Sequence, residues 1–195
     1  MKESLQTLSS NAQWHSLVHE AQAKAHLHLS EILEHYLVVL LSRFTRRAQS
    51  LCRAVAPHYL EAMCNDGHQR PKDLRNVGDT CLLLSGLFPG RSRKLAVNTG
   101  YYIGLGQTAY GEAATHLDTN DYPLFLMLAQ RFISVMDVLI AIRLMGDNNS
   151  LLPDPLCAYE LKQQHGSHVA MQVVSKHCTP TNTIIVGYDS KTNLH

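Results

Sequence analysis

The sequence predicts an all-α fold: a single-domain bundle of about seven or eight helices around a buried central helix at 121–145. Two observations support this prediction. Along most of the chain, apolar residues recur at the three- and four-residue spacing of one helix face. The stretch 121–145 is instead apolar on nearly every side, which is typical of a helix buried all round in a large core.

The predicted central helix has recognisable ends. Asp121 and Pro123 suit its first turn, because a carboxylate can cap free N–H groups and proline has no N–H to satisfy. Gly146 follows the last apolar residue, where helices commonly end. Beyond Asp121 at its start, three charged side chains lie within the stretch: Arg131, Asp137 and Arg143. Because each charge is costly in lipid, they argue against a membrane span.

The other predicted helices are recognised by their caps and by apolar periodicity. They span 11–25, 30–47, 57–63, 73–88, 100–117, 155–164 and 168–176. Ser10 and Gln13 fit a capping box at the first helix, and Asn98 or Thr99 caps the helix 100–117. No glycine or proline separates the first two helices, so the sequence leaves open whether they are continuous.

A single domain is expected over 1–178, followed by an extended or disordered C-terminal tail at 179–195. A chain of 195 residues can bury one sizeable core, and no internal repeat or low-complexity tract interrupts it. The tail contains a β-like run, 183–188, which has no partner strand in the sequence.

Glycines make 100–117 the most unusual predicted helix. Each interior glycine costs about 0.8–1 kcal/mol relative to alanine, so something should offset them. Small residues form a stripe along one face: Gly100, Gly104, Thr108, Gly111 and Thr115. We expect this stripe to let the central helix or 73–88 pack closely. The segment around Gly104 and Gly106 could alternatively be a dinucleotide-binding loop. That loop requires a strand directly before it, and Asn98 and Thr99 interrupt any strand.

Composition favours an ordinary globular protein of the cytoplasm. The net charge is +1, so no global field attracts nucleic acid or acidic membrane. The chain is histidine-rich, with 12 histidines whose protonation in mild acid would make it strongly cationic. The five cysteines are odd in number and widely spaced, which favours reduced thiols. The N-terminus lacks the apolar segment of a secretory signal.

A polar pocket is the first candidate site. Seven polar residues fall on helices that are otherwise largely apolar: Asp79, Tyr101, Tyr102, Gln107, Tyr110, Gln130 and Asp137. Buried polar groups must be paired, so some of these side chains should hydrogen-bond across the core. We favour a structural network over a ligand pocket for this set.

A metal or haem site is the alternative candidate. Histidines and glutamates recur at helical spacing: His15, His19, Glu31, His35, Glu112 and His116. Such groups from different helices can build a metal site in a bundle core. The chain lacks the paired Glu-x-x-His motifs of di-iron bundles, however, so we favour a solvated face and expect no cofactor.

Two other functional classes have little support. A helix-turn-helix within 159–176 would need a small residue and an apolar residue where Lys162 and Gln172 stand, so sequence-specific nucleic-acid binding is not expected. No serine or cysteine lies in a nucleophile-elbow context, so no catalytic residue is assigned.

Four segments within residues 30–176 read EHYLVVLLSRFTRR, GDTCLLLSGLFPGR, YYIGLGQTAYGEAA and LCAYELKQQHGSHVA. Together they resemble a family of uncharacterised, all-helical proteobacterial proteins of about 200 residues. The resemblance implies a single all-helical domain in a bacterial cytoplasm. It implies no activity, cofactor or functional residue.

For function we rank first a non-enzymatic binding or regulatory protein that recognises another protein through a helical surface. The alternative is a helical bundle that binds a small molecule, metal or haem, with or without catalysis. The sequence leaves homo-oligomerisation open.

Overall fold

The computed structural model describes residues 2–46, 55–88, 98–116, 121–146 and 155–177. These residues form nine helices and no strand, which confirms the all-α prediction. The helices are α1 (Lys2–Ala25), α2 (Glu31–Arg46), α3 (Val55–Cys64), α4 (Gln69–Gly86), α6 (Thr99–Thr115), α7 (Tyr122–Gln130), α8 (Phe132–Gly146), α9 (Pro155–His165) and α10 (His168–His177). The predicted tail at 179–195 lies outside the described residues.

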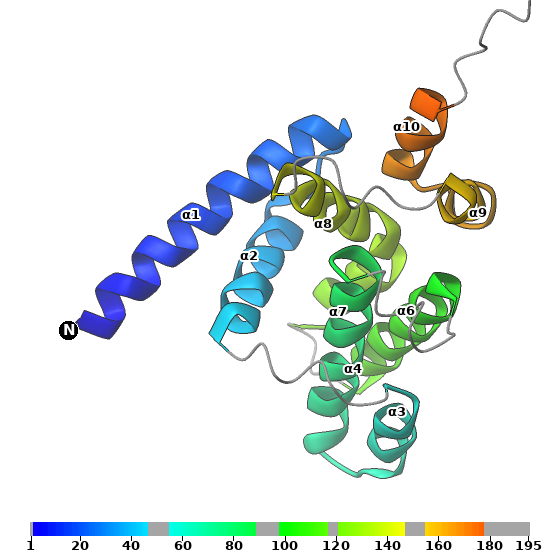
Figure 1. Cartoon of the computed structure of the whole chain (residues 1–195). Coiled ribbons are helices and arrows are strands. Elements are labelled where there is room, and N and C mark those ends of the chain that lie inside the picture. The colour runs from blue at the N-terminus through cyan, green and yellow to red at the C-terminus, as the bar shows by residue number, and fades with distance from the viewer. Residues whose placement is uncertain (1, 47–54, 89–97, 117–120, 147–154, 178–195) are drawn as a thin grey trace, which may run out of the picture.

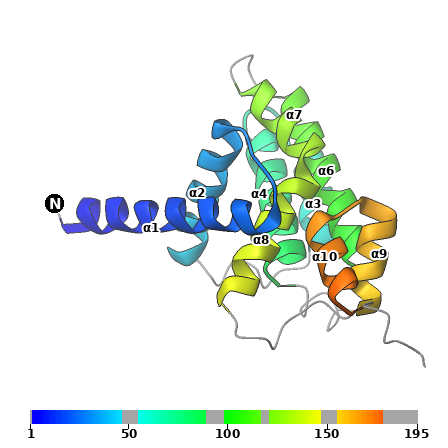
Figure 2. The ribbon, with the colours of Figure 1, turned by 90° about the horizontal axis from the view of Figure 1, so that it is seen from above.

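The helices pack as a bundle in which α6 and α8 each contact several other helices (Figure 1). α6 packs mainly against α4 and α7, while α8 packs against α1 and α4. α9 and α10 form a hairpin that contacts α8 and α6. The N-terminal half of α1 extends away from the other helices, which Figure 2 shows from above.

The first two helices are separate. α1 ends at Ala25, and His26 follows in the left-handed region at φ 53. Gln22 then closes the turn, because its side chain accepts a hydrogen bond from the Leu29 N–H at 2.7 Å and donates to Glu34 at 3.0 Å. α1 also begins at Lys2, nine residues before the predicted start.

The prediction of one continuous helix over 121–145 is wrong. It is two helices, α7 and α8, which are bent by 70° at Arg131. No glycine or proline marks the bend, so its cause is tertiary packing. A straight helix of this length would extend roughly 38 Å. The bend instead folds both apolar halves into one core, with Phe125 and Phe132 both buried.

The predicted burial holds for the middle of the second half. Residues 135–142 of α8 are all buried. Pro123 lies in the first turn of α7, as predicted, but Asp121 makes no side-chain cap hydrogen bond. Within the described parts of the chain, no single helix is long and apolar enough to cross a membrane. α7 and α8 satisfy such a test only as a pair, despite their bend.

The close helix contact of α6 is made by Gly106. A Cβ at this position would lie 2.5 Å from Cε2 of Phe132 and 2.9 Å from Cβ of Cys81. Glycine is therefore required where α6 meets α4 and α8. A similar approach occurs at Gly86 of α4, where a Cβ would lie 2.5 Å from Cβ of Leu139.

The predicted packing of the small-residue stripe on α6 is wrong for most of its length. At Gly104 and Gly111 a Cβ would meet no atom of the described residues within 4 Å. Thr108 and Thr115 are exposed. The neighbouring helices cover the opposite side of α6, so the stripe faces outward. Gly100 alone has a close neighbour, because its Cβ would lie 3.0 Å from Nε2 of His165.

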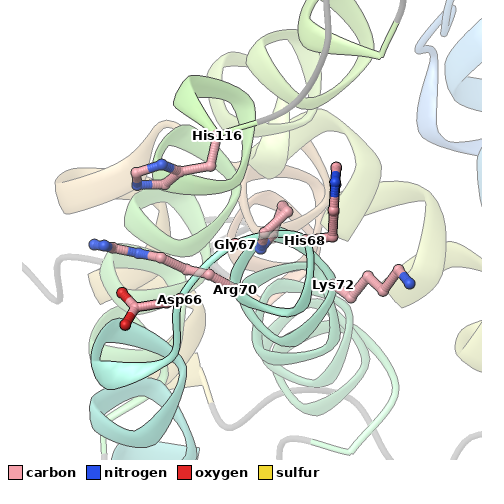
Figure 3. Close-up of a pocket in the computed structure, with 7 residues that line it drawn as sticks. Asp66, Gly67, His68, Arg70, Lys72 and His116 are labelled. Atoms are coloured by element: carbon pink, nitrogen blue, oxygen red, sulfur yellow. The ribbon is translucent and has the colours of Figure 1, made fainter.

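A pocket of about 570 Å³ opens where the turn between α3 and α4 meets the end of α6 (Figure 3). It is lined by Asp66, Gly67, His68, Arg70, Pro71, Lys72 and His116.

The substitutions Gly106→Ala and Gly104→Ala should have opposite effects on stability. The new methyl group at Gly106 would overlap Phe132 and Cys81, so we expect Gly106→Ala to lower the free energy of unfolding by about 1–3 kcal/mol. Gly104→Ala adds a methyl group in open space on the same helix, so we expect a gain of about 0.8–1 kcal/mol. Urea denaturation followed by circular dichroism measures both. Similar effects of the two substitutions would contradict this packing.

Candidate functional site

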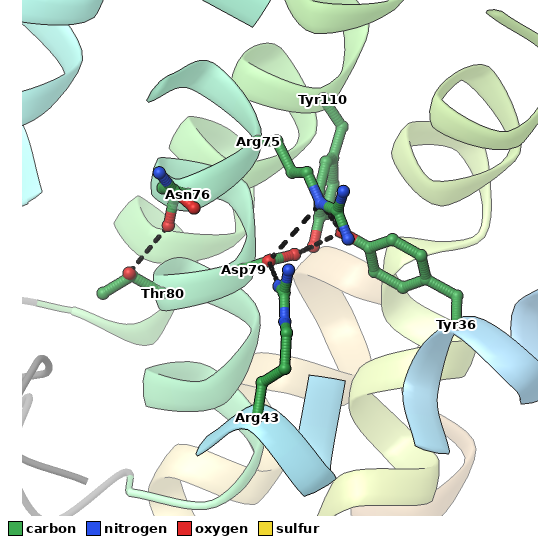
Figure 4. Close-up of polar contacts among 7 residues, drawn as sticks. All are labelled: Tyr36, Arg43, Arg75, Asn76, Asp79, Thr80 and Tyr110. Carbon is green, nitrogen blue, oxygen red and sulfur yellow. Dashed lines mark hydrogen bonds and ion pairs between the residues drawn. The ribbon is translucent and has the colours of Figure 1, made fainter. Parts of the chain in front are cut away.

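A carboxylate in the middle of α4 collects polar side chains from two other helices (Figure 4). Asp79 Oδ1 accepts hydrogen bonds from the hydroxyls of Tyr36 on α2, at 2.5 Å, and Tyr110 on α6, at 2.8 Å. Asp79 Oδ2 accepts from Arg43 Nη2 at 2.6 Å. We call these four residues and Arg75 the Asp79 cluster.

Arg75, also on α4, connects the cluster to α7. Its Nε donates to the Tyr36 hydroxyl at 3.2 Å. Its guanidinium also lies over the rings of Tyr36 and Phe125, at 5.2 and 5.7 Å from the ring centres. A cation over an aromatic face is attracted by the ring quadrupole, so Arg75 is bound by charge and by packing together.

Burial controls the chemistry of the two phenols. Desolvation, reinforced by the charge of Asp79, raises the pKa of Tyr36 and of Tyr110 well above the usual tyrosine value. Both hydroxyls therefore remain protonated donors near neutral pH. Neither can serve as a general base under those conditions.

The cluster is closed to a substrate on its inner side. Tyr110 is 0% exposed and Tyr36 is 6% exposed, whereas the Arg43 side chain is 46% exposed. Both oxygens of Asp79 are already engaged by donors. The arrangement therefore serves to join α2, α4 and α6, as expected for a structural network of paired buried groups.

The sequence identified only part of this cluster. Asp79 and Tyr110 belong to the predicted polar set, whereas Tyr36, Arg43 and Arg75 do not. Two signals in the sequence could have indicated them. Arg75 stands four residues before Asp79, and Arg43 stands two helical turns after Tyr36 on the same face.

Asp137 lies in a second, separate network. Its Oδ1 accepts from the Ser167 hydroxyl at 2.5 Å, and its Oδ2 accepts from the His168 N–H at 2.7 Å. The Ser167 hydroxyl in turn caps α10 by accepting from the Ala170 N–H at 3.1 Å. Burial raises the pKa of Asp137. This carboxylate therefore fastens the start of α10 to α8.

The remaining predicted pocket residues lie apart from both networks. Gln107 Nε2 donates to the Ala129 carbonyl at 3.3 Å, and Gln130 is exposed at the end of α7. Tyr101 and Tyr102 make an edge contact with ring centres 5.6 Å apart, and only Tyr102 is buried. The seven residues thus form no common pocket.

The histidines and glutamates of the metal alternative are also dispersed. His15 Nε2 lies 3.1 Å from an oxygen of Glu34, and it has no second histidine partner there. His19, Glu31 and His35 are exposed, and His116 lines the pocket beside α4. Among the residues that the structure describes, no three histidine, cysteine, aspartate or glutamate side chains are placed to hold one metal ion.

The outward side of α6 is also unusual. It carries Tyr101, Gly104, Thr108, Gly111 and Thr115, and we call it the open α6 face. Tyr101 is 45% exposed at one end. Comparisons with known families, curated proteins and solved structures find no match to this chain.

Removing the Asp79 carboxylate should destabilise the bundle. Asp79→Ala leaves two buried phenol hydroxyls without an acceptor, at about 1–3 kcal/mol each. We expect a loss of about 2 kcal/mol or more in the free energy of unfolding, measured by urea denaturation. Asp73→Ala on the same helix is the control. Its carboxylate accepts from Asn65 and Gln69 in a more exposed place, so we expect a loss below about 1 kcal/mol.

Removing the Asp137 carboxylate should loosen α10 without disturbing the centre of the bundle. We expect Asp137→Ala to increase amide hydrogen exchange across residues 168–177, because the Ser167 hydroxyl and the His168 N–H lose their acceptor. Exchange in α4 and α6 should change little. Ser134→Ala, on the same helix, is the control. Unchanged exchange in α10 of the Asp137 variant would contradict the assigned role.

Proposed function

We propose that this chain is a non-enzymatic binding or regulatory protein of the bacterial cytoplasm, and that it recognises another protein through the open α6 face. The observation that carries the proposal is that Gly104 and Gly111, inside a long helix, have no close neighbour among the described residues. Neither glycine is needed for packing against the described part of the chain.

The energetic argument rests on helix propensity. Two interior glycines forfeit about 1.6–2 kcal/mol relative to alanine. The described neighbours of Gly104 and Gly111 do not offset this loss, since a Cβ would fit at both positions. A helix from a partner, lying close against the α6 backbone, would offset it by contacts that a side chain would block.

The polar groups on this face are compatible with burial. The Thr108 hydroxyl donates to the Gly104 carbonyl at 2.9 Å, and the Thr115 hydroxyl donates to the Glu112 carbonyl at 2.8 Å. A partner that covers this face therefore leaves neither hydroxyl donor unsatisfied. Tyr101 adds an exposed aromatic ring, a residue type that is enriched in protein interfaces.

The spacing of the face favours a helical partner. Tyr101, Thr108 and Thr115 are each seven residues apart, and the two glycines lie between them. This is the a and d pattern of a helix seam, with small residues that permit a short distance between helix axes.

The cysteines support the proposed compartment. Cys64 and Cys81 are both free thiols, Cys64 exposed and Cys81 buried. Free thiols persist in the reducing cytoplasm.

Leucine substitutions test the proposed interface. The partner is first captured with the full-length chain from native lysate and purified, and its dissociation constant is then measured by calorimetry. We expect Gly104→Leu and Gly111→Leu to weaken binding at least about tenfold, because the side chain prevents close approach of the helices. If the partner is a second copy of this chain, the same variants should shift the sedimentation equilibrium toward monomer.

Ala23→Leu is the matched control, because it adds the same side chain to an exposed position of α1. It should bind like the natural sequence. The two glycine variants should also be at least as stable as the natural sequence, since leucine is the better helix former. Stable glycine variants with unchanged affinity would refute the proposed interface.

A further inference from the structure

The pocket between the α3–α4 turn and the end of α6 is large enough for a small molecule. Its volume of about 570 Å³ lies within the range of small-molecule sites in proteins. The lining comes from two distant parts of the chain, residues 66–72 and His116. None of its lining residues belongs to the open α6 face.

Positive charge dominates the lining. Arg70 and Lys72 are permanent cations at neutral pH, and His68 and His116 add two imidazoles, against the single carboxylate of Asp66. The ion pairs found within the described residues include neither Arg70 nor Lys72. This pocket therefore has cationic groups that the described fold does not neutralise.

Arg70 is the least satisfied of these groups. Its Nη2 donates to the sulfur of Met63 at 3.5 Å, which is a weak acceptor. Its Nε is shielded from solvent and has no hydrogen-bond partner in the described structure. A buried guanidinium N–H without an acceptor is costly, and an oxygen of a bound anion would remove that cost.

The groups surround the turn from two sides. Figure 3 shows Arg70 and His116 on one side of Gly67, with His68 and Lys72 on the other. The N–H groups at the start of α4 add partial positive charge. No side chain offsets it, because His68 at the N-cap makes no side-chain cap hydrogen bond and the first turn has no acidic residue.

We infer that this pocket binds a small molecule through a phosphate group held by Arg70 and His116, which lie on the same side of Gly67 (Figure 3). A phosphate monoester carries close to two negative charges at neutral pH, so the cationic lining attracts it more strongly than it attracts the single charge of a carboxylate. Its oxygens also match the planar donor fork of a guanidinium. The pocket volume exceeds that of a bare ion and leaves room for the rest of the molecule.

Calorimetric titration of the full chain with glycerol 1-phosphate tests this assignment, with inorganic phosphate and acetate as comparison probes. We expect saturable binding of the monoester, equal or weaker binding of inorganic phosphate, and the weakest binding of acetate. Arg70→Gln and His116→Gln should each weaken binding of the monoester, the arginine variant by about tenfold or more. The two variants come from different segments, so failure of one to fold leaves the other as a test.

Arg46→Gln is the matched control, because it removes the same charge from the exposed end of α2, outside the pocket lining. It should bind the monoester like the natural sequence. Three outcomes would overturn the assignment: no saturable binding of either phosphate probe, tighter binding of acetate, or equal weakening by Arg46→Gln and Arg70→Gln. None of these outcomes bears on the protein interface proposed for α6.

Discussion

The carboxylate of Asp79 is the interaction on which the arrangement of the bundle depends. It lies on α4 and accepts hydrogen bonds from α2 and α6, so three helices are held at one point. A buried carboxylate is stable only when its oxygens are paired. The partners must therefore keep their places, and α2 and α6 can neither slide nor rotate on α4 without leaving a buried charge unpaired.

Packing around this point explains the bend between α7 and α8. The Phe125 ring contacts the rings of Tyr36 and Tyr110, so α7 covers the Asp79 cluster. The next aromatic residue, Phe132, instead fills the notch at Gly106. One straight helix would carry much of its apolar surface beyond the core, whereas two helices at 70° cover both places.

The two surfaces proposed for function share one physical feature. Each contains groups that make no close contact within the described fold: two interior glycines on α6, and the Nε of Arg70 in the first turn of α4. The buried polar groups behave differently, because Asp79 and Asp137 are saturated by their own neighbours. We therefore place function on the surfaces and assign the interior networks to stability.

The sequence by itself determined the helical class, most helix positions and the cap of α6, because apolar spacing and capping are local properties. Asn98, one of the two predicted candidates, caps α6. Tertiary structure alone decided which glycine of α6 meets a neighbour, which polar residues converge, and where 121–145 bends. Each depends on which face of a helix its neighbours cover, and that choice is settled by packing between residues far apart in the chain.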